Sequence, residues 1–157
     1  MKIVVVSDTH IPARLSALPG LVYEVCADAD LIIHAGDIEE REVINDLLRL
    51  APVKAVKGNM DLLRLPETLT LELQGFKICV AHGSGPYHNV RERLKLKFQQ
   101  QKPDIIIHGH THIYHLSKDH NTVFLCPGAV ANPTGSRSIV ILTLEAGKQP
   151  AYEKISF

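Results

Sequence analysis

The chain has 157 residues and a mass of 17.4 kDa, the usual size of one domain, so we expect a single domain over residues 1–157. Apolar residues make up 45% and charged residues 22%, a composition that excludes intrinsic disorder of the chain as a whole. The longest apolar runs are too short to cross a bilayer. The 17 basic residues balance the 17 acidic ones, so the chain lacks the positive excess typical of proteins that bind a nucleic-acid backbone.

Strands alternate with helices in the first half of the chain. Apolar runs rich in β-branched residues predict three buried strands, at residues 2–7, 30–34 and 53–56. The segments between them predict two helices, at residues 18–29 and 39–50. We expect Glu39 and Glu40 in the first turn of the second helix, where acidic side chains stabilise the helix dipole. This alternation is typical of βαβ units on a parallel sheet.

The second half of the chain changes character. Residues 68–81 predict a β-hairpin that turns at Gln74-Gly75, and residues 104–108 predict another buried strand. Residues 89–101 predict an amphipathic helix whose charged face is exposed to solvent. After Ile113 the pattern is all β, with turns at residues 119–121, 133–135 and 146–147. A mixed α/β fold with two sheets fits this order.

Five polar clusters each follow directly on an apolar strand. They are Ser7-Asp8-Thr9-His10, Gly36-Asp37, Gly58-Asn59, Ala81-His82-Gly83 and Gly109-His110-Thr111-His112. Ligands of open α/β sheets bind at the carboxyl ends of the strands, so we expect the five clusters to meet at one rim. Carboxylate, amide and imidazole groups in combination are typical of a transition-metal site.

The number of candidate ligands favours two metal ions over one. The seven side chains are Asp8, His10, Asp37, Asn59, His82, His110 and His112. A zinc ion takes about four ligands, whereas two ions can share seven if one carboxylate bridges them. Asp37 is the expected bridge because it follows a central strand. Two divalent ions would leave about one positive charge after two carboxylates and a hydroxide are counted, which suits an anionic phosphate ester.

Each motif also has an ordinary structural interpretation when it is taken alone. Gly-Asp and Gly-Asn are common turn pairs, and an isolated His82 would more often be a hydrogen-bonded, half-buried histidine. His34 and His108 fall inside predicted strands and are interpreted as core or supporting residues, and His88 as part of the loop before a helix. The three cysteines are interpreted as reduced core residues of a cytosolic protein.

The five motifs in this order resemble the calcineurin-like metallophosphoesterase superfamily, and the short chain with Pro127-Gly128-Ala129 resembles its small YfcE-type phosphodiesterase branch. The resemblance implies a four-layer α/β/β/α sandwich with two mixed central β-sheets. It also implies two metal positions. One would be held by Asp8, His10, Asp37 and His112, and the other by Asp37, Asn59, His82 and His110.

The chain departs from the pattern of the family at three positions. Met60 stands where many relatives have a histidine that serves as general acid. Compared with the YfcE-type branch, Ser84 replaces the second histidine of His-Gly-His and Ala129 replaces the serine of Pro-Gly-Ser. Met60 cannot donate a proton, and a general acid contributes about 10²–10⁴-fold to rate. The substrate is therefore expected to carry a good leaving group, although the YfcE-type branch commonly lacks this histidine too.

These observations predict a metal-dependent phosphodiesterase in which a metal-bridging hydroxide attacks phosphorus in line, with Asp37 and Asn59 as catalytic residues. The resemblance implies Mn²⁺, with Ni²⁺, Fe²⁺ or Zn²⁺ as other candidates. The alternative is a non-catalytic protein-binding scaffold like the retromer subunit of this fold. A nuclease would need a basic track, so short oligonucleotides or cyclic nucleotides are the nucleic acids left open. We expect a cytoplasmic protein without a signal peptide, which could form a homo-oligomer.

Overall fold

The computed structural model describes residues 1–132 and 135–157, and the strands in it form two five-stranded sheets. The first sheet pairs β1 and β2 in parallel, β2 and β3 in parallel, and β1–β9–β10 antiparallel. Its strands in spatial order are β10 (Ala151–Ser156), β9 (Ser138–Thr143), β1 (Lys2–Val6), β2 (Leu31–His34) and β3 (Val53–Ala55). Continuous β-branched runs form the central strands because both faces of this sheet are covered.

The second sheet is also mixed. Strand β6 pairs in parallel with β5 and β8, while β4–β5 and β7–β8 are antiparallel hairpins. Its strands in spatial order are β4 (Thr68–Leu73), β5 (Phe76–Ala81), β6 (Ile105–Ile107), β8 (Thr122–Pro127) and β7 (Tyr114–Asp119). The predicted hairpin over residues 68–81 and the turns at 119–121 and 146–147 are confirmed, whereas 133–134, within the remaining predicted turn, lie outside the described residues.

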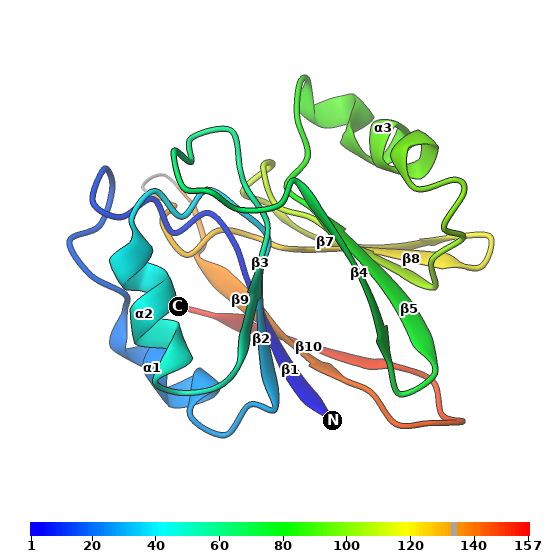
Figure 1. The fold of residues 1–157 in the computed structure, drawn as a ribbon, viewed down its shortest axis with the longest axis horizontal. Helices are drawn as coiled ribbons and strands as arrows, with labels where there is room; N and C mark the ends of the chain where they lie inside the picture. Colours follow the sequence, from blue (N-terminus) through cyan, green and yellow to red (C-terminus); the bar gives the residue numbers. More distant parts are fainter. Residues whose placement is uncertain (133–134) are drawn as a thin grey trace.

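Helices cover the outer face of each sheet. Figure 1 shows α1 (Gly20–Cys26) and α2 (Arg41–Leu48) beside the first sheet and α3 (Val90–Lys97) beside the second. A short 3-10 turn, Tyr87–Asn89, leads into α3. The resulting order of layers is helix, sheet, sheet, helix, which confirms the expected four-layer α/β/β/α sandwich.

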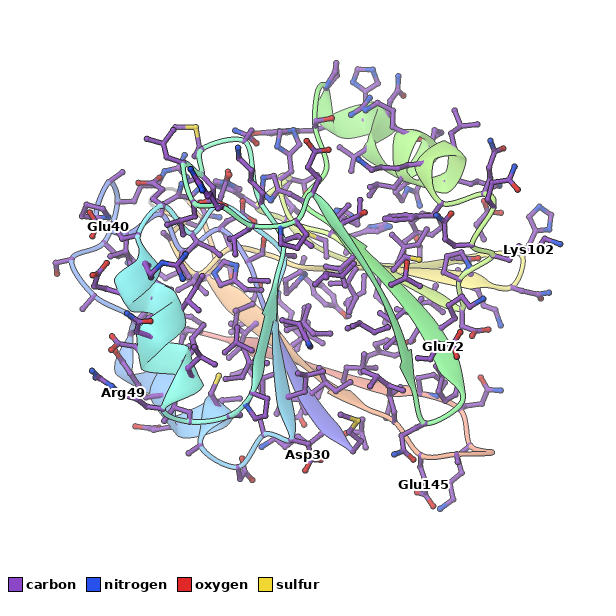
Figure 2. All side chains as sticks on the ribbon, viewed as in Figure 1. Asp30, Glu40, Arg49, Glu72, Lys102 and Glu145 are labelled. Atoms are coloured by element: carbon purple, nitrogen blue, oxygen red, sulfur yellow. The ribbon has the colours of Figure 1, made fainter. Side chains whose placement is uncertain are left out.

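Three apolar clusters hold these layers together, and alternate strand residues divide between them. Ile3 and Val5 of β1 point between the sheets toward residues such as Ile78 and Ile107, while Val4 points to the opposite face, where α1 and α2 pack. A third cluster packs α3 on the second sheet. Figure 2 shows side chains filling the space between the sheets. Because strand side chains alternate with period two, each central strand contributes to two cores at once.

The helices are shorter than predicted. The structure corrects the position of Glu39, because this residue lies before α2 with φ at 75° and its backbone N–H is bonded to Asp61. Glu40 is the cap residue, so Glu42 is the acidic residue of the first turn. The three cysteines are buried and unpaired, as expected. Within the described ranges, every helix is too short or too polar to cross a bilayer.

Candidate metal centre

The five polar clusters meet at one edge of the sandwich, where β1, β2, β3, β5 and β6 end. Backbone hydrogen bonds join the loops that carry them. The N–H of Asp8 donates to Gly36 at 3.0 Å, and the N–H of His10 donates to Asp37 at 3.1 Å. Gly109 bonds to the carbonyl of His82 at 3.0 Å, which ties the loop of the second sheet to its neighbour. The site is therefore built across both sheets.

The first group of candidate ligands comprises Asp8, His10, Asp37 and His112. One ligand atom from each of the four lies within 4.8 Å of all the others. His112 Nε2 is 3.1 Å from Asp8 Oδ1, and His10 Nε2 is 3.6 Å from Asp37 Oδ2. Three of the four residues are buried. Two imidazole and two carboxylate groups at this spacing can surround a single divalent cation.

The second group lies on the other side of Asp37. His82 Nε2 is 3.2 Å from Asp37 Oδ2, and the rings of His82 and His110 are 5.4 Å apart. His110 Nε2 lies 2.8 Å from the carbonyl of Gly85, which can only accept, so this nitrogen carries the proton. The lone pair on His110 Nδ1 then faces Asn59 Oδ1 at 3.2 Å. Two acceptors that face one another are stabilised by a cation between them.

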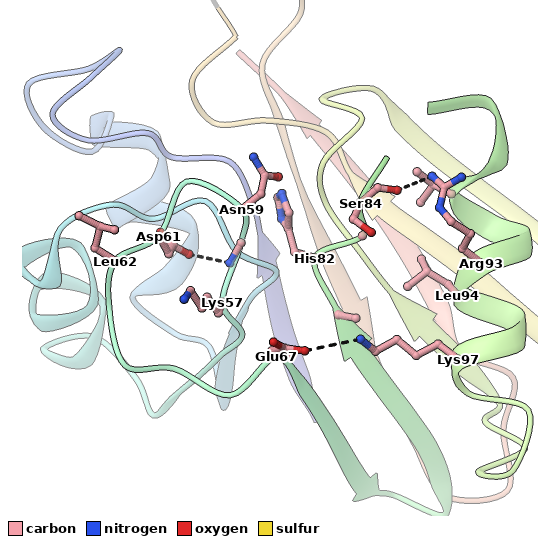
Figure 3. Close-up of a pocket in the computed structure, with 14 residues that line it drawn as sticks. Lys57, Asn59, Asp61, Leu62, Glu67, His82, Ser84, Arg93, Leu94 and Lys97 are labelled. Carbon is pink, nitrogen blue, oxygen red and sulfur yellow. Dashed lines mark hydrogen bonds and ion pairs between the residues drawn. The ribbon is translucent and has the colours of Figure 1, made fainter. Parts of the chain in front are cut away.

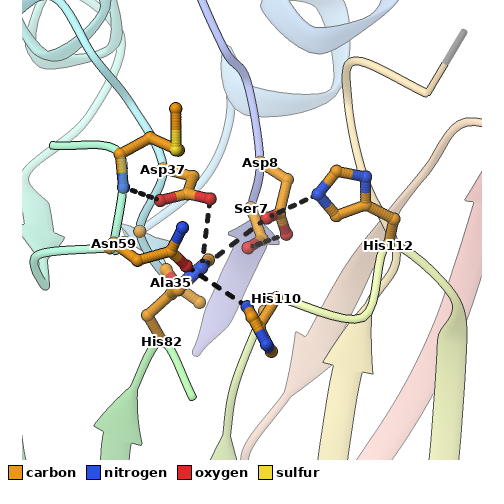
Figure 4. A network of polar contacts seen from close by, with 12 residues as sticks. Ser7, Asp8, Ala35, Asp37, Asn59, His82, His110 and His112 are labelled. Atoms are coloured by element: carbon orange, nitrogen blue, oxygen red, sulfur yellow. Dashed lines mark hydrogen bonds and ion pairs between the residues drawn. The ribbon is translucent and has the colours of Figure 1, made fainter. Parts of the chain in front are cut away.

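Two buried polar atoms of the site have no hydrogen-bond partner among the described residues: Asp8 Oδ1 and His82 Nε2. They lie 3.9 Å apart (Figure 4). Leaving a buried polar atom unsatisfied costs about 1–3 kcal/mol, and native structures rarely tolerate it without a reason. A divalent cation can be coordinated by both a carboxylate oxygen and the lone pair of an imidazole nitrogen. The donor set therefore fits a metal ion.

Hydrogen bonds behind the ligand atoms orient the side chains. His10 Nδ1 donates to Glu39 Oε1 and His82 Nδ1 donates to the carbonyl of Ala35, both at 2.7 Å. Ser7 Oγ donates to Asp8 Oδ2 at 2.5 Å. With Nδ1 protonated and occupied, each imidazole presents the lone pair of Nε2 to the centre, as metal-binding histidines require.

Sequence reasoning gave no role to Asp61, which organises the loops beneath the site. Its buried carboxylate accepts four backbone N–H groups at 2.6–3.1 Å, those of Asp37, Ile38, Glu39 and Gly58. It thereby joins the loop after β2 to the loop after β3. The available signal was its place at the end of the Gly-Asn-x-Asp motif. Glu39 was also missed, because it was assigned to the first turn of α2.

The backbone around the site is strained. Of the described residues other than glycine, nine have positive φ, and six of these lie here: Asp8, His10, Asp37, Glu39, His110 and His112. Each such residue costs roughly 1–2 kcal/mol relative to an ordinary conformation. Strain of this kind persists where packing and hydrogen bonds enforce it, and it concentrates at functional sites. Here it turns successive side chains toward one point.

Two glycines permit a close approach of the loops. A Cβ on Gly109 would lie 1.9 Å from Ser7 Oγ and 2.8 Å from Asp8 Oδ2. A Cβ on Gly58 would lie 2.2 Å from both N and Oδ1 of Asp37. Neither φ is positive, so these positions require glycine for space and not for backbone conformation.

Burial and neighbouring charges shift the pKa values of Asp37 and His82 in opposite directions. Burial alone would raise the pKa of Asp37, but the contact with His82 outweighs it and holds this pKa below its usual value. Burial opposes the charge of His82, but Asp37 and Asp8 raise its pKa above the usual value. Burial lowers the pKa of His34 and of His108 to about 4, so both are neutral supporting residues at neutral pH.

The fold and the site define a class of proteins: α/β/β/α sandwiches that carry a cluster of His, Asp and Asn side chains at the strand ends. Residues 1–147 match the calcineurin-like phosphoesterase superfamily domain. A probable metallophosphoesterase of Methanocaldococcus jannaschii is 40% identical over 147 residues, which cover 92% of this chain and 77% of the relative. The chain belongs to the calcineurin-like phosphoesterase superfamily.

Solved structures agree with this family. Vps29 of Entamoeba histolytica in complex with Zn²⁺ is 25% identical, with a TM-score of 0.82 over 99% of both chains. A predicted phosphoesterase of Streptococcus pneumoniae is 26% identical, with a TM-score of 0.69 over 99% of this chain and 97% of that one. The family and the donor set together support a divalent metal as cofactor.

Proposed function

We propose that this protein hydrolyses phosphodiesters, or phosphoesters with a good leaving group, with two divalent metal ions, Mn²⁺ foremost. The observation that carries the proposal is the position of Asp37. Its Oδ2 lies between His10 Nε2 at 3.6 Å and His82 Nε2 at 3.2 Å, one from each candidate ligand group. A carboxylate flanked in this way suits a bridge between two cations.

Divalent ions bound here would polarise the phosphoryl oxygens and lower the pKa of a bound water. The residues of this chain would hold them in two sets that share Asp37. The first set is Asp8, His10, Asp37 and His112, and the second is Asp37, Asn59, His82 and His110. Asn59 is exposed at the mouth of the site, where its amide can also contact and orient the phosphate.

The choice of a diester follows from the residue at position 60, which cannot act as a general acid. Water forms a new P–O bond as the bond to the leaving oxygen breaks, and that oxygen must take up a proton. Met60 is exposed at the rim beside Asn59, but its thioether has no proton to donate. Solvent must then protonate the leaving group, which favours aryl or otherwise stable leaving groups over unactivated monoesters.

The test is hydrolysis of bis(4-nitrophenyl) phosphate by metal-free protein with and without added Mn²⁺. We expect activity that depends on Mn²⁺ and that Asp37→Asn removes, with Asp28→Asn at the exposed Lys2 ion pair as the matched control. Metal analysis of the loaded protein should give two ions per chain. Mn²⁺-loaded protein without hydrolysis, or activity that Asp37→Asn leaves unchanged, would exclude the proposal.

A non-catalytic protein-binding scaffold is the second candidate, and a specific observation favours it. Several large apolar side chains at the rim are exposed: Met60, Leu62, Tyr87 and Ile113. The likeness to Vps29 supports this candidate only weakly, since one of those Vps29 structures is itself a zinc complex. A scaffold does not need a complete set of candidate ligands, so retention of two ions after dialysis would count against it.

A further inference from the structure

A cavity of about 520 Å³ lies beside the metal centre, on the side of Asn59 and His82. Figure 3 shows it between the loop that follows β3 and helix α3, two segments that lie far apart in sequence. Its polar lining residues outside the candidate ligands include Lys57, Asp61, Glu67, Ser84, Arg93 and Lys97. Because Asn59 and His82 also line it, the cavity adjoins the second group of candidate ligands.

Positive charge is concentrated in this cavity. Lys57, Arg93 and Lys97 contribute three cations, against the single exposed carboxylate of Glu67. The carboxylate of Asp61 is buried and directed at its own four N–H donors. The whole chain has a formal net charge of +0, so the excess here is local. A cleft lined by one sign of charge focuses its field on a ligand of the opposite sign.

Two of the three cations are available to a ligand. Arg93 is engaged, because its guanidinium donates to the carbonyls of Ser84 and Pro86 and holds that loop in place. Lys97 contacts Glu67 across the cavity at 4.0 Å, and both side chains are largely exposed, so this pair contributes little. The ammonium of Lys57 forms no ion pair within the described part of the chain.

The rest of the lining is apolar. Val90 and Leu94 of α3 are buried at its wall, and Leu62 is 95% exposed on the loop side. The cavity thus combines apolar side chains with the two exposed lysines, Lys57 and Lys97. This combination fits a phosphodiester whose second substituent has an apolar body and an anionic end.

We propose that this cavity is a specificity subsite for a second anionic group on the diester, and that Lys57 and Lys97 recognise it. The inference rests on the proposed function, since it assigns a substrate class to the same site. The cavity takes no part in bond formation or cleavage. It selects a diester whose substituent carries a phosphate or a carboxylate over the same diester without one.

A matched pair of probes isolates that group: thymidylyl-thymidine with and without a 5′-phosphate. We expect the Mn²⁺-loaded protein to cleave the internal diester of the phosphorylated form with kcat/KM about tenfold higher, from the two exposed charge contacts with Lys57 and Lys97. The double variant Lys57→Gln, Lys97→Gln should abolish the difference while it still hydrolyses bis(4-nitrophenyl) phosphate. Lys95→Gln, on α3 beside Asp119 and outside the cavity, is the control.

A binding measurement decides the subsite independently of catalysis. Calorimetry on metal-free protein should show about tenfold tighter binding of the phosphorylated dinucleotide, lost in the double variant and retained in the Lys95→Gln control. Equal affinity for the two dinucleotides, or a preference that the double variant keeps, overturns the subsite. Release of the 5′-phosphate as inorganic phosphate also overturns it, because that group would then lie at the reaction centre. If binding behaves as expected but no phosphoester is hydrolysed, only the proposed function fails.

Discussion

The substitution Asp61→Asn tests whether one buried carboxylate holds the loops of the centre. The carboxylate accepts N–H groups of Ile38 and Glu39 through Oδ1, and of Asp37 and Gly58 through Oδ2. Asparagine has the same shape but only one oxygen, so its amide NH₂ would face two of these donors. Each buried donor left unsatisfied costs about 1–3 kcal/mol, which gives a loss of about 2–6 kcal/mol. This is a large part of the 5–15 kcal/mol typical of a whole domain.

Urea unfolding of the metal-free protein at pH 7 measures this loss, and calorimetric titration with Mn²⁺ measures its effect on the site. We expect Mn²⁺ affinity to fall about 10–100-fold, as when groups that orient metal ligands are removed. Asp119→Asn, which breaks an exposed ion pair with Lys95, should leave both measurements nearly unchanged. A loss of stability below about 1 kcal/mol with unchanged Mn²⁺ affinity would refute the role of Asp61.

Three further predictions concern space, pH and metal. Gly109→Ala would place a Cβ 1.9 Å from Ser7 Oγ, so Mn²⁺ affinity measured by calorimetry should fall at least about tenfold. Gly20→Ala, which meets nothing within 4 Å, should have no effect, and equal effects would contradict the steric argument. The pKa of His34 is about 4 when folded and 6.5 in its usual state, so the unfolded chain takes up the proton first as pH falls. Wild-type protein should therefore lose about 2 kcal/mol more stability than His34→Asn between pH 7 and pH 5 in urea unfolding, and parallel losses would exclude this. Mn²⁺ at about 100 times its Kd should raise the free energy of unfolding by about 2.7 kcal/mol, and Asp37→Asn should remove this gain; a gain retained by the variant would place the ion elsewhere.

The sequence by itself determined the strands and the order of the polar clusters. Runs such as Ile3–Val6 and Ile105–Ile107 are local patterns, and apolar periodicity identifies a buried strand without knowledge of its neighbours. The general rule that ligands gather at the carboxyl ends of strands then placed Asp8, Asp37 and His82 at one rim, where the structure has them. The helices were placed correctly, but their ends depend on contacts outside each helix and were predicted less well.

The tertiary structure alone decided which groups support the site and which line the cavity beside it. Asp61 and Glu39 act mainly through hydrogen bonds to residues 22 to 29 positions away, and the Gly-Asn-x-Asp motif that ends at Asp61 does not show which groups its carboxylate contacts. Lys57 and Lys97 likewise line one cavity although they are far apart in the sequence, because the fold packs α3 near the loop after β3. A side chain's direction and partners depend on backbone angles, and here those angles are held in strained values by the folded surroundings. The pattern of apolar residues along the chain indicates which segments are buried, whereas the meeting of distant side chains at one site depends on how the whole fold packs.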